Sequence, residues 1–456
     1  MKTNKGSVSQ FIGSCAAVLP RAWMLLILAV GAAVEAGGVT LTVDRVQQRY
    51  PWNGLVDIDY TVTYAPGVSA GLDSNIEVLM IDRAVTPAVT NRALIFLQAP
   101  LPTTAGQHRI TWDANADGVT NRTDQAEVRM SLVRYSEAYM VVDVSKGPDA
   151  TEYPVDFLNG APPNGFNTDE YKGDKIVLRR VCPGSYVAGA PTTEYGITPA
   201  REVQHRVMLT KPFYLGLFEI TQQQFVNVMG SAKNKSAYKI HLFRPVEQVS
   251  YDTIRGKADT GTHQYDWPWN NDVADDSFMG RLRAKCKSKD EDGNYTVAVS
   301  GFDLPTEFQW EHACRAGTTG GYSTTMAYAN TAEGCAAAMA KLGRCSDNKT
   351  DKHGGDYQQH TIVGSYEPNP WGFYDIHGNV WEWCLDWYLE GVQTLKQFVD
   401  PKGPDDGGLQ YSIGERIKRG GGWSNNAAAA RSGQRASDAS STESDKLGFR
   451  LARMLP

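Results

Sequence analysis

The chain has 456 residues, which exceeds one ordinary domain and favours two or three. Hydrophobic residues make up 41% of it and charged residues 21%, a composition that excludes a chain without a folded core. The formal net charge of −6 disfavours nucleic acid and anionic lipid as partners, because like charges repel.

The first 36 residues have the order of a secretory signal peptide. Lys2, Lys5 and Arg21 precede the apolar run 22–30, and small residues then lead to Ala36. The run is too short for a comfortable membrane span. We expect cleavage after Ala36, no membrane span in the mature chain, and a secreted, periplasmic or cell-surface protein. An uncleaved N-terminal anchor is the alternative.

Residues 37–145 predict a β-sandwich domain of immunoglobulin-like type. Short segments there alternate apolar and polar residues, and Gly, Pro, Asn and Asp separate them. These segments are 39–43, 56–62, 76–79, 108–112 and 128–132. The loop 113–124 carries oxygen side chains at the spacing of a calcium-binding loop, but an acidic Asx-Gly turn between strands explains them equally well.

Residues 146–174 are rich in Pro, Gly, Asn and Asp and predict a linker to a domain over 175–456. Two helices are expected in that domain. The segment 220–229 opens with a Thr-x-x-Gln capping box at Thr221. The segment 305–315 begins at a proline and is followed by a helix-ending glycine.

Six of the seven cysteines remain once the signal is removed. An even number permits disulfides in an oxidising compartment. Cys335 and Cys345 bracket a short loop and are the best candidates for a pair. No Cys-x-x-Cys spacing indicates a zinc site.

Ordered sequence landmarks between residues 177 and 451 resemble the formylglycine-generating enzyme, or sulfatase-modifying factor, family. They are the segments 178–189, 212–221, 245–251, 304–311, 369–383, 419–423 and 447–450. The most specific of them reads NPWGFYDIHGNVWEW. The resemblance implies an α+β, C-type-lectin-like fold with a small twisted antiparallel sheet, two helices and long ordered loops. Large rings such as its tryptophans would pin such loops.

The resemblance also implies structural calcium. One site would draw on Asn379 and Glu382 with the carbonyl of Val380 between them, and Asn330 would supply a second site. Amide, carboxylate and carbonyl oxygens are the ligands that calcium prefers. The alternative is a hydrogen-bonded turn in which Glu382 caps backbone amides.

The cysteines that carry the family's chemistry are missing. Family members oxidise a substrate cysteine with copper held by two cysteines five residues apart, which follow an Arg-Gly-Gly-Ser motif. Here Gly422 takes the place of that serine, and no cysteine lies between Leu385 and Pro456. Amides and methyl groups cannot replace thiolates as ligands of copper(I). We therefore expect neither copper nor formylglycine formation, and we assign no catalytic residue.

With the fold kept and the thiols lost, the sequence favours a pseudoenzyme that serves as a ligand-binding or surface scaffold module. A protein or carbohydrate at the cell surface would be its ligand. The small, polar run 424–446 lies between two framework motifs, where loops on a rigid scaffold usually carry recognition. The candidate ligand contacts are Trp381, Trp423, Asn425, Asn426, Arg431 and Arg435.

The alternative function is an oxidoreductase of the same superfamily that acts on a protein or peptide cysteine. Its chemistry would have to move to Cys314, Cys384 or Cys182. In an exported protein these thiols are expected to be buried or disulfide-bonded instead.

Overall fold

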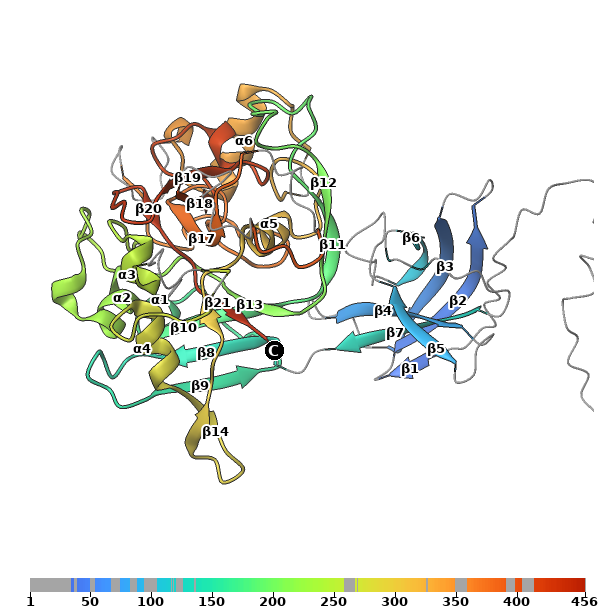
Figure 1. Ribbon diagram of the computed structural model, residues 1–456, viewed down its shortest axis with the longest axis horizontal. Helices are drawn as coiled ribbons and strands as arrows, with labels where there is room; N and C mark the ends of the chain where they lie inside the picture. Colours follow the sequence, from blue (N-terminus) through green and yellow to red (C-terminus); the bar gives the residue numbers. More distant parts are fainter. Residues whose placement is uncertain are drawn as a thin grey trace, which may run out of the picture. The chain divides into compact units, whose positions relative to one another are not determined.

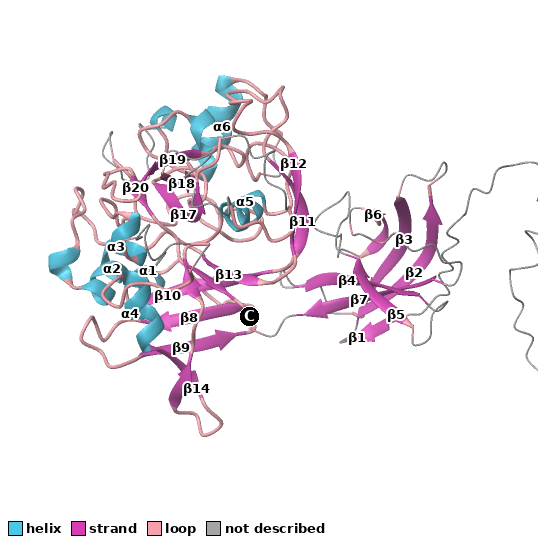
Figure 2. Ribbon diagram, viewed as in Figure 1, coloured by secondary structure: helices cyan, strands magenta, loops and turns pink. Residues whose placement is uncertain are grey.

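The computed structural model describes residues 34–36, 39–49, 54–66, 74–82, 88–93, 105–115, 117, 119, 126–134, 137–257, 267–268, 270–324, 327–348, 359–390, 398–403 and 414–455 (Figures 1 and 2). The chain forms two compact units, a smaller one that ends at Leu132 and a larger one from Val133 onward. Within the described ranges, no helix has the length and apolar character needed to cross a membrane. The predicted signal peptide lies mostly outside the described residues, and it stays a prediction.

Among the described residues, the smaller unit contains two sheets. One has the order β1-β2-β3-β6, with β1 (Val34–Ala36), β2 (Val39–Gln48), β3 (Leu55–Tyr64) and β6 (Gly106–Asp113). The other has the order β5-β4-β7, with β4 (Ser74–Asp82), β5 (Val89–Ala93) and β7 (Ala126–Arg134). The alternation along β3 buries every second side chain, because neighbouring residues of a strand face opposite sides.

The five strands predicted for this unit are therefore present, and β1 and β5 were missed. The immunoglobulin-like topology stays a prediction. In the loop after β6, the Asp117 carboxylate accepts a 2.5 Å hydrogen bond from Trp112 Nε1. Asn121 and Asp124 of the predicted calcium loop lie outside the described residues.

The predicted linker over 146–174 is wrong. It contains β9 (Tyr153–Leu158) and α1 (Asp169–Gly173), and β9 pairs with β8 (Tyr139–Asp143) on one side. On its other side β9 pairs in parallel with β14 (Cys286–Lys289). The predicted boundary at residue 145 also cuts this sheet, because β8 belongs to the larger unit.

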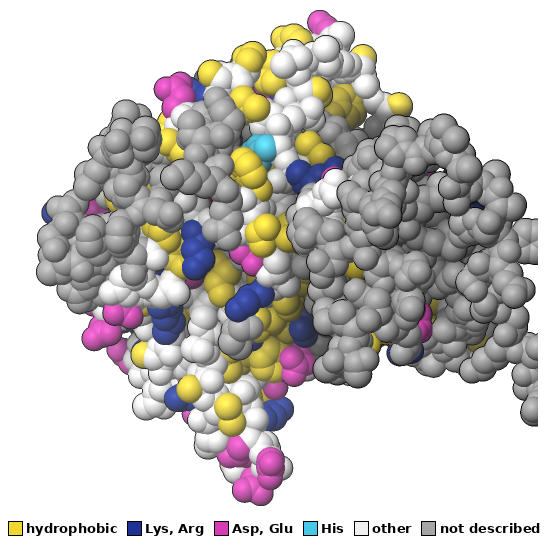
Figure 3. Space-filling model, turned by 45° about the vertical axis from the view of Figure 1, so that its right-hand side comes forward, with side chains coloured by type: hydrophobic (Ala, Val, Ile, Leu, Met, Phe, Trp, Pro, Cys, Tyr) yellow, Lys and Arg dark blue, Asp and Glu magenta, His cyan; other side chains and the backbone are white. Residues whose placement is uncertain are grey.

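The larger unit is built on an eight-stranded sheet with the order β15-β14-β9-β8-β10-β13-β21-β16 (Figure 1). The strands not yet given are β10 (Lys175–Val181), β13 (Phe213–Gly216), β15 (Tyr295–Ala298), β16 (Phe302–Asp303) and β21 (Ala452–Met454). The β14–β15 hairpin projects from one end of the sheet, and acidic side chains gather at its tip (Figure 3). Its turn reads Asp290-Glu-Asp-Gly-Asn294.

Beside this sheet, helix α4 (Phe278–Lys285) contacts both α2 (Gln222–Met229) and α3 (Tyr251–Arg255). They join it in one apolar core that includes Met140, Leu178, Phe225 and Phe278. The predicted first helix is confirmed as α2, with its capping box between Thr221 and Gln224 complete.

The predicted second helix is confirmed as α5 (Glu307–Arg315), which has a second capping box at Thr306 and Gln309. Helix α5 contacts two smaller sheets (Figure 1). One of them is β11 (Gly184–Ala188) with β12 (His205–Leu209). The other has the order β19-β18-β17-β20 and consists of β17 (Trp381–Trp387), β18 (Glu415–Arg419), β19 (Ala436–Ala439) and β20 (Leu447–Gly448).

Helix α6 (Ala332–Leu342) forms a satellite core that contains both Cys335 and Cys345. The expected disulfide between them is wrong in this structure, because both thiols are free. The two cysteines share an apolar cluster, so burial alone accounts for them.

Candidate functional site

Two of the sequence landmarks meet in a buried ion pair. The Glu382 carboxylate on β17 accepts from Arg450 Nη2 at 2.7 Å and from Arg450 Nε at 3.0 Å. It also accepts from Trp310 Nε1 of α5 at 2.7 Å. All three side chains are at most 1% exposed. The ion pair therefore ties the central motif to the last one, which is a structural role.

Asn379 donates a hydrogen bond to a buried carboxyl group. Its Nδ2 donates to Glu219 Oε2 at 2.6 Å, and the Val380 N–H donates to Glu219 Oε1 at 3.1 Å. Asn379 Oδ1 accepts from the Thr361 N–H at 2.8 Å. Asn379 has φ +61°, a left-handed conformation that asparagine tolerates better than most residues.

This arrangement does not fit a calcium ion. A calcium site needs several oxygens free to face the cation, whereas protein N–H groups occupy the side-chain oxygens of Asn379 and Glu382. The guanidinium of Arg450 already supplies the positive charge beside Glu382. Within the described residues, no group of three or more His, Cys, Asp or Glu side chains is arranged to hold a metal. Calcium binding thus stays a prediction of the sequence.

Three buried carboxyl groups interact with one another beside Asn379, those of Glu219, Asp375 and Glu382. Burial, and then the neighbouring Asp375, raises the pKa of Glu219 well above its usual range. Burial raises the pKa of Asp375 to about 6. Asp375 Oδ2 accepts from the Gly364 N–H at 2.6 Å. Protons on these carboxyls reduce the repulsion that three buried charges would otherwise produce.

Asn330, the predicted ligand of a second calcium site, hydrogen-bonds to a neighbouring turn. Its Oδ1 accepts from the Tyr195 N–H and its Nδ2 donates to the Thr193 carbonyl, both at 2.7 Å. Both ends of the amide are therefore used by the backbone of one turn.

A cleft of about 420 Å³ lies over β17, β18 and β19, and we call it the sheet cleft. It brings together two of the predicted ligand residues, Trp381 and Asn425. The other side chains that shape it were missed from the sequence: Arg201, Tyr388, Glu390, Glu415, Lys418 and Ser437. Ser437 belongs to the small polar run that the sequence analysis singled out.

Contacts within the sheet cleft orient its polar groups. Trp381 Nε1 donates to Asn425 Oδ1 at 2.8 Å, which leaves the amide NH₂ group of Asn425 unused among the described residues. The Lys418 ammonium lies 5.3 Å from the centre of the Trp381 ring. Ser437 Oγ donates to Glu415 Oε2 at 2.6 Å. The cleft is thus polar and held in shape by its own hydrogen bonds.

Arg431 and Arg435 are wrong as ligand contacts. Arg431 is fully buried and pairs with Glu202 at 2.7 Å and Glu194 at 2.6 Å. Arg435 is 3% exposed and pairs with Glu307 at 2.7 Å. The chain needs these guanidiniums to neutralise buried carboxylates, and no sequence signal distinguished that role from ligand binding.

Trp423 and Asn426 are close in sequence to Asn425, which lines the sheet cleft. Neither of them lines the cleft itself. Trp423 is 9% exposed, and its Nε1 donates to the Asp445 carbonyl at 3.1 Å. Asn426 is exposed and begins the short helical turn Ala427–Ala430.

Two of the three candidate thiols, Cys314 and Cys384, are buried, whereas Cys182 is only partly buried. Cys314 Sγ lies 3.7 Å from His377 Nε2, a pairing that resembles a catalytic Cys–His dyad. However, burial raises the pKa of Cys314 to about 12 and lowers the pKa of His377 to about 4, so both are neutral near pH 7. Burial also raises the pKa of Cys384 well above its usual range. A thiolate is the reactive form, so neither cysteine suits catalysis.

Residues 170–455 match the Sulfatase-modifying factor enzyme 1-like domain. The formylglycine-generating enzyme of Streptomyces coelicolor is 33% identical over 158 residues, which cover 34% of this chain and 47% of that protein. The mouse enzyme is 29% identical over 158 residues and is covered to 39%. The chain thus spans less than half the length of these two enzymes. A bovine protein named inactive C-alpha-formylglycine-generating enzyme 2 is 26% identical over 301 residues, which cover 61% of this chain and 89% of that protein.

The solved structures similar to this chain include two of bacterial proteins. PvdO from Pseudomonas aeruginosa has a TM-score of 0.44 and 21% identity, and covers 61% of this chain and 94% of its own. Treponema denticola variable protein 1 has a TM-score of 0.43 and 24% identity, with 62% and 96% covered.

Proposed function

Because the chain belongs to the sulfatase-modifying factor enzyme 1-like domain family, we propose that it is a non-catalytic, ligand-binding member of that family. Its ligand would be a carbohydrate at a cell surface, bound in the sheet cleft, and the protein would be exported to reach it. The observation that carries this proposal is the cleft itself, in which two predicted contacts, Trp381 and Asn425, lie together.

The charges of the sheet cleft support a neutral ligand. Its two basic side chains, Arg201 and Lys418, face two acidic ones, Glu390 and Glu415, so the lining has no net formal charge. Lys418 also pairs with Asp438, which is not one of the lining residues. The NH₂ group of Asn425 can donate and the hydroxyl oxygen of Ser437 can accept, and such neutral groups suit a ligand rich in hydroxyls.

The second candidate is an oxidoreductase acting on a protein or peptide cysteine. Family resemblance favours it, but the lining of the sheet cleft contains no thiol. The name of the bovine relative shows that an inactive protein also exists in this family. A binding role therefore fits the residues better.

Binding to an array of glycans, with the purified chain 37–456, tests the proposal. Asn425→Ala is expected to weaken binding of a captured glycan about fivefold or more, since it removes hydrogen bonds from the cleft. Asn426→Ala is the matched control, because Asn426 is exposed but outside the cleft. Glycan binding that Asn425→Ala leaves unchanged would contradict the cleft as the site. Binding of a protein partner alone would move the proposal to a protein ligand.

A second assay tests the absence of catalysis. The chain is incubated with a sulfatase-type cysteine peptide, oxygen, reductant and copper, beside an active formylglycine-generating enzyme. We expect no mass change in the peptide. Conversion of its cysteine to formylglycine would overturn the non-catalytic assignment and favour the oxidoreductase.

A further inference from the structure

The chain contains four Asn-x-Ser/Thr motifs, the acceptor sequence for N-linked glycans. They begin at Asn121, Asn234, Asn294 and Asn348. Asn121 lies outside the described residues, so the structure bears on the other three. A glycan is bulky, and its transfer therefore requires an asparagine whose side-chain nitrogen is open to solvent.

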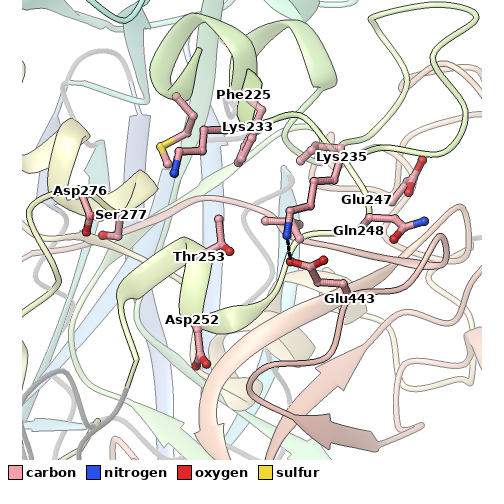
Figure 4. Close-up of a pocket in the computed structure, with 13 residues that line it drawn as sticks. Phe225, Lys233, Lys235, Glu247, Gln248, Asp252, Thr253, Asp276, Ser277 and Glu443 are labelled. Carbon is pink, nitrogen blue, oxygen red and sulfur yellow. Dashed lines mark hydrogen bonds and ion pairs between the residues drawn. The ribbon is translucent and has the colours of Figure 1, made fainter. Parts of the chain in front are cut away.

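The motif at Asn234 is part of the core. Asn234 is 7% exposed, and its Oδ1 accepts from the Ser236 N–H at 3.0 Å. Ser236 is 4% exposed, and its Oγ donates to the Glu247 carbonyl at 3.3 Å. Lys235, between them, lines a pocket beside α2 and α3 and pairs with Glu443 at 2.5 Å (Figure 4). All three positions of this motif are therefore engaged within the fold.

The motif at Asn348 is closed to a glycan as well. Asn348 is 7% exposed, and its Nδ2 donates to the carbonyls of Met339 and Gly343 at 3.1 and 2.7 Å. The nitrogen that would carry the sugar thus already binds the end of α6. A substituent on it would remove at least one of these bonds and would need space that a close-packed core does not have.

Asn294 is the exposed acceptor among the three. It lies in the turn of the β14–β15 hairpin, which projects from the sheet and carries acidic side chains at its tip (Figures 1 and 3). Its backbone is bonded to Asp290 and Thr296. Its side-chain amide makes no hydrogen bond among the described residues. The nitrogen can therefore react without loss of any contact of the fold.

The hairpin also presents the rest of this motif. The Tyr295 hydroxyl donates to Asp156 Oδ1 on β9 at 2.9 Å, which holds the middle residue of the motif against the sheet. Thr296 is exposed, and its Oγ1 donates to Asp290 Oδ2 at 2.6 Å. Because this bond lies at the surface, an enzyme that binds the motif can replace it with a contact of its own. Both residues that define the motif are thus accessible on one projecting turn.

From these differences we infer that Asn294 is an N-glycosylation site of the exported protein. The donor would be an oligosaccharide linked to a lipid diphosphate. The bond from its anomeric carbon to the phosphate oxygen breaks, and a bond from that carbon to Asn294 Nδ2 forms. The lipid diphosphate leaves with the electron pair, and the amide nitrogen gives up one proton to a base of the transferase. The inference rests on the proposed export and is independent of ligand binding in the sheet cleft.

A glycan at this place would protect an edge of the sheet. Strand β15 ends the order of the eight-stranded sheet, so one of its sides has no strand partner in the described part of the chain. Val297 on it is 48% exposed. Another chain can pair with such an edge, and a bulky polar group next to it hinders that pairing. The modification would therefore limit association between copies.

Expression in a bacterial host that carries an oligosaccharyltransferase and a lipid-linked oligosaccharide tests the site. One form is the full chain 1–456 with its own N-terminus, and the other is 37–456 behind a signal peptide known to be cleaved. Both carry Asn121→Gln, so that only the three described motifs remain. Mass spectrometry of the periplasmic protein and its peptides should show one glycan, on Asn294, with Asn234 and Asn348 unmodified.

Variants of the motif assign the modification. Asn294→Gln and Thr296→Val should each lose the whole glycan mass, whereas Thr296→Ser, the matched control, should keep it because serine also completes the motif. If Thr296→Val fails to fold, Asn294→Gln still decides the matter, since its side chain makes no contact to lose.

The two forms separate the site from the export. A glycan on the second form alone would support the site and contradict export by the chain's own N-terminus. An unmodified Asn294 in the second form recovered from the periplasm would overturn the inference. Modification of Asn234 or Asn348 to the same extent as Asn294 would overturn it too, because burial would then not select the acceptor.

Discussion

Replacing Arg450 by methionine tests whether the landmark motifs of this family serve stability here. The guanidinium donates to Glu382 through Nε and Nη2, and to the carbonyls of Gly216, Leu217 and Tyr374 at 2.8–2.9 Å. Methionine also has a long unbranched side chain, but it has no hydrogen-bond donor. The variant leaves a buried carboxylate without a counter-ion and several carbonyls without donors.

Breaking a buried ion pair from one side typically costs about 3–5 kcal/mol, and we expect a loss in that range for Arg450→Met. Whole domains are stable by only about 5–15 kcal/mol, so the loss would be large. Adding Glu382→Gln removes the stranded charge while its amide oxygen still accepts from Trp310. The double variant should therefore regain about 1–3 kcal/mol relative to the sum of the single losses.

Urea unfolding followed by tryptophan fluorescence measures these differences, since most of the tryptophans lie in the larger unit. Arg201→Met is the control. Its pair with Glu390 is 3.8 Å long and exposed, and such pairs contribute at most about 1 kcal/mol. A loss of about 1 kcal/mol or less for Arg450→Met, or strict additivity in the double variant, would refute the structural role of the motif pair.

Three further predictions concern protons, thiols and calcium. Burial, and then Glu307, raises the pKa of Asp386 to about 7. The folded state thus holds this proton more tightly than the unfolded state, and stability should fall by up to about 4 kcal/mol as pH rises from about 4 to about 7. Asp386→Asn should reduce this difference in the free energy of unfolding between pH 5 and pH 8, as measured by urea unfolding. An unchanged difference would show that other groups cause it. Thiol titration of the unreduced, unfolded chain 37–456 should count six free cysteines, whereas four would indicate a disulfide such as Cys335–Cys345. Calcium or a chelator should leave the thermal midpoint unchanged, because Arg450 already neutralises Glu382; a rise with calcium would restore the metal site.

Local patterns determined the elements that the sequence predicted correctly. The two capping boxes at Thr221 and Thr306 involve residues only three positions apart, so they can be read directly from the sequence. The period-2 strands of the smaller unit are equally local. The resemblance to the family then predicted the α+β fold of the larger unit.

Tertiary structure decided the rest, because the partners are distant in the chain. Strand β9 lies in a Pro- and Gly-rich stretch, and it is held in the sheet by β8 on one side and by β14, more than 100 residues away, on the other. Arg431 has the composition of a ligand contact, and only its ion pair with Glu202, 229 residues earlier, shows that it is structural. The sequence by itself determined the family, five strands of the smaller unit and helices α2 and α5, and it contains no cysteine between Leu385 and Pro456. Which of its polar residues face a cleft depended on long-range packing, since burial in the core removes a side chain from any ligand.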